Sequence, residues 1–356
     1  MDSKIIDFLS PLWGETLKQL RHDIYHIADY FTLESRRNQG IPEAIVIADG
    51  DKIFFVAYLL RKCDDICDQD SGDLFDVVSP YGFPGILLSE AAASTPGFAN
   101  AAMAEFKRVL SVKGVCSAFL RLHPILNHNI NELFNPNPFT FNGETISIDL
   151  TLPESKLWSH TRKDHRNKIN KCKRAGMTAR MVPFKDYIQE FIEVYQETMD
   201  RVGASGFYYF NYDYFVGLLE TLGEQLHLCI VELDNQIISA GIYTECCGIV
   251  QAVLGGTKTQ FFKQSPSVLE TDFVRLWAKE RGNEFLHLGG GVGGAKDSLY
   301  NFKAGFSKQR HTFLTLRLIT DQEKYRYLVD LRAKALNTDP DKLLHSKFFP
   351  AYRCNH

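Results

Sequence analysis

A glycine-rich loop followed by one lysine is the stretch of this sequence best suited to chemistry. Residues 284–306 read EFLHLGGGVGGAKDSLYNFKAGF, in which apolar residues predict a short strand before the loop. The loop contains five glycines: Gly289, Gly290, Gly291, Gly293 and Gly294. Because glycine has no Cβ, backbone amides of such a loop can approach an anion or a reacting carbonyl closely. Lys303, flanked by aromatic residues, adds a cation beside this candidate ligand cradle.

Two common phosphate-binding motifs are excluded for this loop. Gly289, Gly291 and Gly294 satisfy the spacing G-x-G-x-x-G, but only 62 residues follow Gly294. No acidic residue stands at the end of a second strand about 20 positions on, as the dinucleotide fingerprint requires. The NTPase phosphate loop fails as well, because Lys296 lies between Ala295 and Asp297 rather than between Gly and Ser or Thr.

A basic segment is the second candidate binding element. Residues 155–175 are predicted to form one helix that Gly176 ends. Its second half carries seven cations against the single acid Asp164, in a chain of net charge −3: Arg162, Lys163, Arg166, Lys168, Lys171, Lys173 and Arg174. This local charge favours a docking surface for phosphates. The alternative is a solvated helix face, since several of these cations come from different sides of the predicted helix.

Composition limits the class of protein. The net charge of −3 argues against a generally basic nucleic-acid coat, although a local basic patch is compatible with it. The first residues lack a signal-peptide pattern, and the longest apolar run, residues 53–60, is too short to span a bilayer. Eight cysteines without a CxxC pair indicate reduced thiols. We therefore expect a cytoplasmic protein with no metal site and no bound cofactor.

The elements around these motifs follow one plan twice. A hairpin is predicted over 43–48 and 52–62, and a second over 226–233 and 237–245. Each is followed by an apolar segment ending in a Gly or Pro loop, then a helix, then one more strand. These elements are 77–85, 98–112 and 116–122 in the first half, and 249–257, 268–282 and 285–288 in the second. The repeat predicts two copies of one α+β module, joined by the linker 135–142.

Several blocks resemble the signature blocks of the FemABX family. They are WSHTRKDHRNKINKCKRAGM (158–177), LGGT (254–257), LHLGGGVGG with LYNFKAGF (286–306), and SPYGFPG (79–85). The resemblance is good over 145–315 and weak over 40–145. It implies an α+β (α/β) fold of two tandem GNAT-like modules, each a mixed, mostly antiparallel sheet flanked by helices. We expect modules at 1–140 and 141–320, followed by a C-terminal helix and tail at 321–356.

The sequence also departs from that family. Residues 260–266, QFFKQSP, stand where tyrosines are expected, and no coiled-coil arm is visible. This disfavours a peptidoglycan stem peptide as acceptor. The R/Q-x-x-G-x-G/A loop with which GNAT enzymes hold coenzyme A is missing, because the two glycines after Val253 precede the next helix rather than open it. An acyl-CoA donor is therefore less favoured.

The resemblance implies an acyltransferase, for which we assign residue roles. Lys303 and the loop amides would stabilise an oxyanion, or else Lys303 would bind a phosphate of a substrate nucleotide. Asp297 and Tyr300 are candidate bases, although Asp297 fits a helix N-cap equally well. Lone histidines such as His287 are more often structural. The predicted substrate-binding residues are Arg162, Arg166, Thr257, Tyr81 and the five glycines, with Tyr81 lying in a block that a tight turn also explains.

The predicted function is an N-acyltransferase that moves an aminoacyl group from aminoacyl-tRNA to an amine of a cell-envelope or secondary-metabolite precursor. The alternatives are an acyl-CoA-dependent GNAT enzyme acting on an amino sugar, and a non-catalytic binding protein for tRNA or a nucleotide sugar. The expected partners are a charged tRNA or acyl-CoA and the amine acceptor, and peripheral contact with a membrane is left open.

Overall fold

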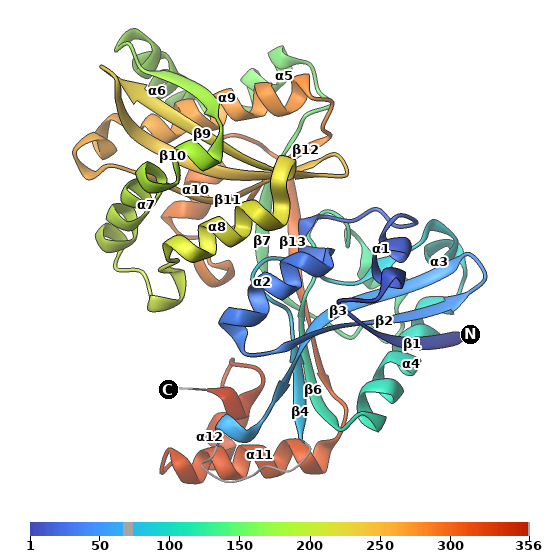
Figure 1. The fold of residues 1–356 in the computed structure, drawn as a ribbon. Coiled ribbons are helices and arrows are strands. Elements are labelled where there is room, and N and C mark those ends of the chain that lie inside the picture. The colour runs from blue at the N-terminus through green and yellow to red at the C-terminus, as the bar shows by residue number, and fades with distance from the viewer. Residues whose placement is uncertain (67–73, 355–356) are drawn as a thin grey trace. The chain divides into compact units, whose positions relative to one another are not determined.

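Both predicted hairpins are present (Figure 1). The computed structural model describes residues 1–66 and 74–354. Strands β2 (Ile41–Asp49) and β3 (Lys52–Lys62) pair antiparallel, as do β9 (Leu226–Leu233) and β10 (Gln236–Cys246). Alternating apolar residues and short polar turns therefore predicted these elements correctly.

The chain divides into two units, residues 1–142 with 312–356, and residues 143–311. Strand β13 (Arg310–Ile319) lies in the first unit from residue 312 onward, where it pairs antiparallel with β6 (Val115–Arg121). This division differs from the predicted modules at 141–320 and 321–356. Element order along the chain could not reveal it, because a strand late in the sequence can join either sheet.

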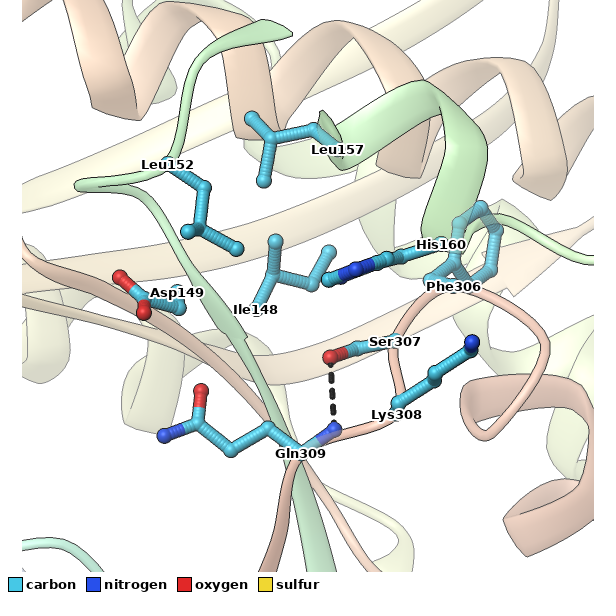
Figure 2. A pocket seen from close by; sticks show the side chains of 9 residues that line it. All are labelled: Ile148, Asp149, Leu152, Leu157, His160, Phe306, Ser307, Lys308 and Gln309. Carbon is cyan, nitrogen blue, oxygen red and sulfur yellow. Dashed lines mark hydrogen bonds between the residues drawn. The ribbon is translucent and has the colours of Figure 1, made fainter. Parts of the chain in front are cut away.

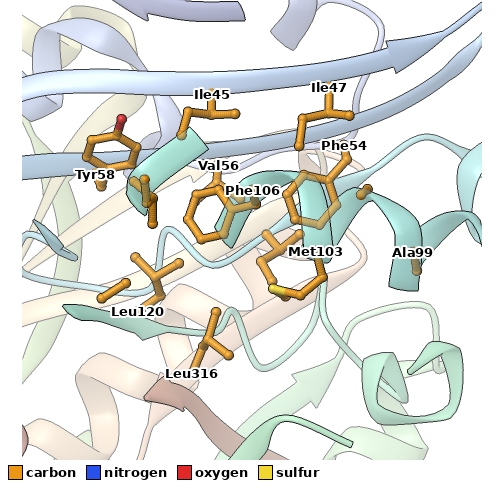
Figure 3. Close-up of a cluster of buried hydrophobic side chains, with 14 of the residues drawn as sticks. Ile45, Ile47, Phe54, Val56, Tyr58, Ala99, Met103, Phe106, Leu120 and Leu316 are labelled. Carbon is orange, nitrogen blue, oxygen red and sulfur yellow. The ribbon is translucent and has the colours of Figure 1, made fainter. Parts of the chain in front are cut away.

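The first unit is built around a sheet of order β1-β2-β3-β4-β6-β13, with β5 beside β3. β4 and β6 are parallel and the other neighbours are antiparallel. The remaining elements of this unit are β1 (Asp2–Asp7), β4 (Phe75–Val78), β5 (Leu87–Leu88), α1 (Pro11–Leu17), α2 (Ala28–Asn38), α3 (Glu90–Ser94), α4 (Phe98–Val112), α11 (Gln322–Ala335) and α12 (Pro340–Leu344). Figure 3 shows Phe54 and Val56 of β3 packed with Met103 and Phe106 of α4 in its core.

The second unit repeats this plan with a sheet of order β7-β12-β11-β10-β9-β8. Here β11 and β12 are the parallel pair, and the chain between them forms a long helix, as it does in α4 between β4 and β6. The remaining elements are β7 (Phe139–Asp149), β8 (Thr178–Val182), β11 (Ile249–Thr257), β12 (Phe285–Gly289), α5 (Glu154–His160), α6 (Lys163–Arg174), α7 (Ile188–Val202), α8 (Tyr212–Leu222), α9 (Pro266–Glu280) and α10 (Ser298–Lys303). The predicted fold class, mixed and mostly antiparallel sheets flanked by helices, is confirmed.

The helices cover the sheets with one apolar face. In α7, Phe191 and Tyr195 are buried, so these aromatic residues form part of the core. Within residues 1–66 and 74–354, none of the helices has both the length and the apolar character needed to cross a bilayer.

The prediction of one helix over residues 155–175 is wrong in one respect, because this segment forms two helices, α5 and α6. The backbone is extended at Thr161 and Arg162. The buried Arg275 of α9 donates to the carbonyl of Leu157 and to Thr161 Oγ1, at 3.2 and 2.6 Å. Arg275 also pairs with Asp272 at 2.5 Å. A cation distant in sequence thus donates to a backbone carbonyl at the end of α5, and the local sequence does not indicate this contact.

Candidate active site

Lys303, the last residue of α10, places its ammonium against the glycine turn that ends β12. Its Nζ donates to the carbonyl of Gly290 at 2.7 Å. A Cβ on Gly289, which has φ +77°, would lie 3.3 Å from the same nitrogen. Burial lowers the pKa of Lys303 to about 8, against the opposing effect of the Asp297 charge. The lysine is therefore a cation that gives up its proton more easily than usual.

Asp297 organises the loop that carries this lysine. Its carboxylate caps α10 by accepting from the amide of Tyr300 at 2.8 Å, and it accepts from the amide of Val292 at 3.0 Å. Burial alone would raise the pKa of Asp297, but these amide hydrogen bonds outweigh it and hold the pKa below the usual value. The N-cap role considered for Asp297 is thus observed, and we treat it as a positioning residue.

Tyr300 belongs to a network that the sequence did not indicate. Its hydroxyl donates to Glu144 at 2.7 Å, and Lys296 pairs with the same carboxylate at 2.8 Å. Burial and the hydrogen bond to Glu144 raise the pKa of Tyr300. Tyr300 is therefore a donor at neutral pH rather than a base. Glu144 is distant in sequence and lies in the middle of β7, so spacing gave no signal for it.

The glycine loop is partly closed by its own hydrogen bonds. The amide of Gly294 donates to the carbonyl of Gly291 at 3.2 Å, and the amide of Ala295 donates to Val292 at 3.1 Å. These two amides of the predicted cradle are therefore not available to a ligand.

The parallel strands β11 and β12 separate next to Lys303. They pair over residues 249–251 and 285–287, and in the described residues no pair continues beyond Gln251 and His287. His287 closes this last pair, with ring nitrogens 2.6 Å from Gln251 Oε1 and 2.8 Å from Thr145 Oγ1. His287 is thus structural. Beyond it, the edge of β11 that faces β12 offers backbone groups to a ligand at the end where Lys303 lies.

The FKAGF segment is the docking site of helix α6. His165 of α6 is buried, lies 2.9 Å from the carbonyl of Phe302 through Nε2, and packs edge-on against Phe306 at 4.7 Å between ring centroids. Burial lowers the pKa of His165, which keeps its ring neutral. The amide of Arg162 donates to Gly305 at 2.7 Å. The segment therefore fixes the start of the basic helix relative to Lys303.

Gly305→Ala should lower the stability of this contact. A Cβ there would lie 2.4 Å from His165 Nε2. We expect the free energy of unfolding to fall by about 1 to 3 kcal/mol, because the added methyl group forces the His165 ring to shift. The loss should be much smaller in a His165→Ala background. Thermal unfolding measures it, with Gly206→Ala as control because a Cβ at Gly206 meets nothing within 4 Å. An equal loss in both backgrounds would contradict the contact.

The two predicted arginines differ in their surroundings. Arg162 is held by Asp164, with nitrogen to oxygen distances of 2.5 and 2.9 Å. The hydrogen bond from Arg162 lowers the pKa of Asp164. Arg166 is half-buried, and the described residues provide no ion pair or hydrogen bond to its side chain. Arg166 thus keeps its hydrogen-bonding capacity for a ligand, whereas Arg162 shares its charge with an acid.

The exposed side of α6 forms a basic stripe. Because His165, Ile169 and Cys172 face the core, the helix turns its opposite side to solvent. This stripe consists of exposed residues spaced for one helix face: Lys163, Asn167, Asn170, Lys171 and Arg174. No acid interrupts it.

The other two predicted binding residues are held by backbone contacts. The amide of Thr257 lies 2.9 Å from Thr198 Oγ1, and its carbonyl accepts from Arg201 at 2.7 Å, which fixes the end of β11 on α7. Tyr81 lies in the first unit, where its amide donates to Glu34 at 3.2 Å and its carbonyl accepts from Tyr30 at 2.9 Å. The structure thus brings Lys303, Asp297, Tyr300 and the glycines together. Thr257 is held on α7 instead, and Tyr81 belongs to the first unit.

Comparison with known proteins defines the class. Residues 159–303 match the family described as "Acetyltransferase (GNAT) domain". This stretch begins just before the basic helix and ends at Lys303. No curated protein matches the sequence. The likeness to a GNAT domain thus belongs to residues 159–303, and the chain is an acyltransferase.

Solved structures show a fold like that of FemX. The crystal structure of FemX matches with a TM-score of 0.70 at 13% identity, over 92% of this chain and 99% of FemX. The C-terminal domain of a putative lysylphosphatidylglycerol synthetase from Agrobacterium fabrum matches with a TM-score of 0.53 at 13% identity, over 91% and 95%. The structure of L-PGS from Bacillus licheniformis matches with a TM-score of 0.52 at 15% identity, over 94% of this chain and 100% of that one. The predicted FemABX-like and GNAT-like character is confirmed.

Proposed function

We propose that the protein transfers an aminoacyl group from aminoacyl-tRNA to the amine of a cell-envelope or secondary-metabolite precursor. The observation that carries this proposal is the Lys303 ammonium, held 2.7 Å from the Gly290 carbonyl where β11 and β12 separate. A carbonyl under attack by an amine develops negative charge, and a positioned cation beside it contributes about 3 to 4 kcal/mol. A donor of this kind places the reaction in the cytoplasm.

The reaction needs no covalent enzyme intermediate. The acceptor nitrogen bonds to the acyl carbon, the ester C–O bond breaks, and the proton lost by nitrogen ends on the leaving oxygen. Lys303 acts by charge in this scheme, and Asp297 and Glu144 hold the loop and Tyr300 in place. We assign no general base.

The turn after β11 is unsuited to the pyrophosphate of coenzyme A. The amide of Thr259 donates to the carboxylate of Glu197 at 2.6 Å, and Glu193 lines the same groove, in which Lys258 is a cation. Pro266 occupies the first turn of α9, so one amide of that helix N-terminus is missing. Carboxylates repel phosphates and take the amides that phosphates would use. This supports a donor whose phosphates bind elsewhere.

The basic stripe of α6 is the surface that we assign to the tRNA. Its cations form no ion pair within the part of the chain that the structure describes, because Asp164 pairs with Arg162, and Arg166 lies on the same helix. Each phosphate neutralised by such a cation releases counterions, so binding should depend strongly on salt.

Removing the stripe charges should weaken donor binding. For Lys163→Ala, Lys171→Ala and Arg174→Ala combined, we expect the slope of log K against log salt to become shallower by about 2 to 3. Filter binding of charged tRNA over a salt series measures it. The control replaces three exposed lysines outside α6, Lys107, Lys185 and Lys342, by alanine. An equal change in the two triple variants would contradict a specific docking surface.

The donor is tested directly with labelled substrates. Radiolabelled aminoacyl-tRNA and acetyl-CoA are each offered with a mixture of amine acceptors. We expect transfer from tRNA that ribonuclease abolishes. Transfer from acetyl-CoA alone would overturn the tRNA donor in favour of a coenzyme A enzyme, and binding without transfer from either would overturn catalysis.

A further inference from the structure

A second site lies in the same unit but takes no part in the proposed acyl transfer. It is a cavity of about 160 Å³ beside the FKAGF segment, between the end of β7, helix α5 and the loop after α10 (Figure 2). Its lining residues come from these three segments: Ile148, Asp149, Leu152, Leu157, His160, Phe306, Ser307, Lys308 and Gln309.

The inner wall of this cavity is apolar. Ile148, Leu157 and Phe306 are almost fully buried, and Leu152 is half-buried beside them. An engineered apolar cavity of about 150 Å³ stays dry and holds a benzene molecule. The wall therefore suits an apolar group of about four to six carbon atoms.

One side of the cavity offers hydrogen-bond acceptors. The side-chain oxygen Oε1 of Gln309 is buried and has no hydrogen-bond partner among the described residues. Asp149 lies on the same side in Figure 2, and its Oδ1 accepts from the amide and hydroxyl of Thr151 at 3.0 and 2.6 Å. The described residues leave Asp149 Oδ2 without a hydrogen bond. A buried acceptor without a donor costs free energy, so a ligand that brings N–H groups is favoured.

The other side of the cavity offers donors. Figure 2 shows Lys308 extending away from Asp149, and within the described residues Lys308 has no ion pair. The Ser307 hydroxyl oxygen accepts from the amide of Gln309 at 3.0 Å, which leaves its O–H to donate. These groups suit a carboxylate.

We propose that this cavity binds a free hydrophobic α-amino acid of valine or leucine size. Its ammonium group contacts Asp149 and Gln309, its carboxylate contacts Lys308 and Ser307, and its side chain lies on Ile148, Leu157 and Phe306. The site is separate from the proposed acyl-transfer site, because its lining includes neither Lys303 nor the glycine loop, Asp297 or Tyr300.

Calorimetry with the full chain tests this with L-leucine and two analogues that each lack one charge. We expect saturable binding of leucine with a Kd below about 1 mM. N-acetyl-L-leucine and isoamylamine should bind at least about 10-fold more weakly, since each loses a charge-assisted contact. Absence of saturable leucine binding up to about 10 mM would overturn the proposal. Isoamylamine binding as tightly as leucine would also overturn it.

Variants locate the binding in this cavity. Asp149→Asn should weaken leucine binding at least about 10-fold, through loss of the ammonium's charged partner. Leu152→Phe should abolish binding by filling the apolar space. Asp213→Asn, at an exposed position on α8, is the matched control. Lys303→Met should bind leucine as the parent does, so failure of acyl transfer and failure of this site are distinguishable. Unchanged affinity in both cavity variants would overturn the assignment.

Discussion

Lys303→Met should lower kcat for acyl transfer by about 100-fold or more, because it removes the cation that faces the developing oxyanion. Methionine keeps a similar length and an unbranched side chain, so packing in α10 changes little. Single-turnover rates with saturating donor measure the effect. Lys185→Met, at an exposed position, is the control and should leave the rate unchanged.

The same variant should be at least as stable as the parent. Burial lowers the pKa of Lys303 to about 8, which means that the fold disfavours the charged form. Methionine removes that cost and loses one hydrogen bond, to Gly290. A 100-fold loss of rate accompanied by a large drop in Tm would contradict a catalytic role, because the loss would then reflect unfolding.

Glu270→Gln should make the protein more stable at high pH and leave it unchanged at low pH. Burial raises the pKa of Glu270 to about 7, although hydrogen bonds from Ser239 and Tyr243 act in the opposite direction. The raised pKa favours folding below the unfolded value of 4.5, and this contribution is lost as pH rises through about 7. At pH 8.5 the parent therefore holds a buried carboxylate. The Glu270→Gln variant should then be about 2 to 3 kcal/mol more stable to unfolding than the parent.

The hydrogen bonds around Glu270 support its neutral form. Ser239 Oγ lies 2.8 Å from both the Gly256 carbonyl and Glu270 Oε2, yet a hydroxyl has one hydrogen. A protonated Glu270 can donate to Ser239 while Ser239 donates to Gly256, and a glutamine amide can do the same.

Urea midpoints at pH 5 and pH 8.5 measure this effect. Glu193→Gln, at an exposed position of α7, is the control and should show no such difference. If the urea midpoint of Glu270→Gln differs from that of the parent by the same amount at both pH values, the Glu270 carboxyl is not a buried neutral acid.

The sequence predicted those elements whose signals are local. The hairpins around β3 and β10 and the helix α4 follow from period-two and helical apolar patterns with turn residues at their ends. The position of Lys303 beside the glycine turn also follows from short sequence separation. Its role in catalysis stays a prediction.

Features that depend on distant residues were not predictable. The break between α5 and α6 depends on Arg275, and the support of Tyr300 depends on Glu144, 156 positions away in sequence. The exposed cations of the basic stripe share one side of α6, whereas the sequence suggested several sides. Burial of His165 by the FKAGF segment sets the rotation of the helix. In each case a side chain from another element decides between local alternatives that look alike in sequence.

The most direct test of the account is the pH dependence of the single-turnover rate with hydroxylamine as acceptor, which is already deprotonated at neutral pH. If the Lys303 ammonium stabilises the oxyanion, the rate should fall as pH rises through about 8, the pKa to which burial lowers this lysine. Lys303→Arg should show no such fall, because a guanidinium stays charged. A parent rate that rises through this range would contradict the account, and so would one that does not change.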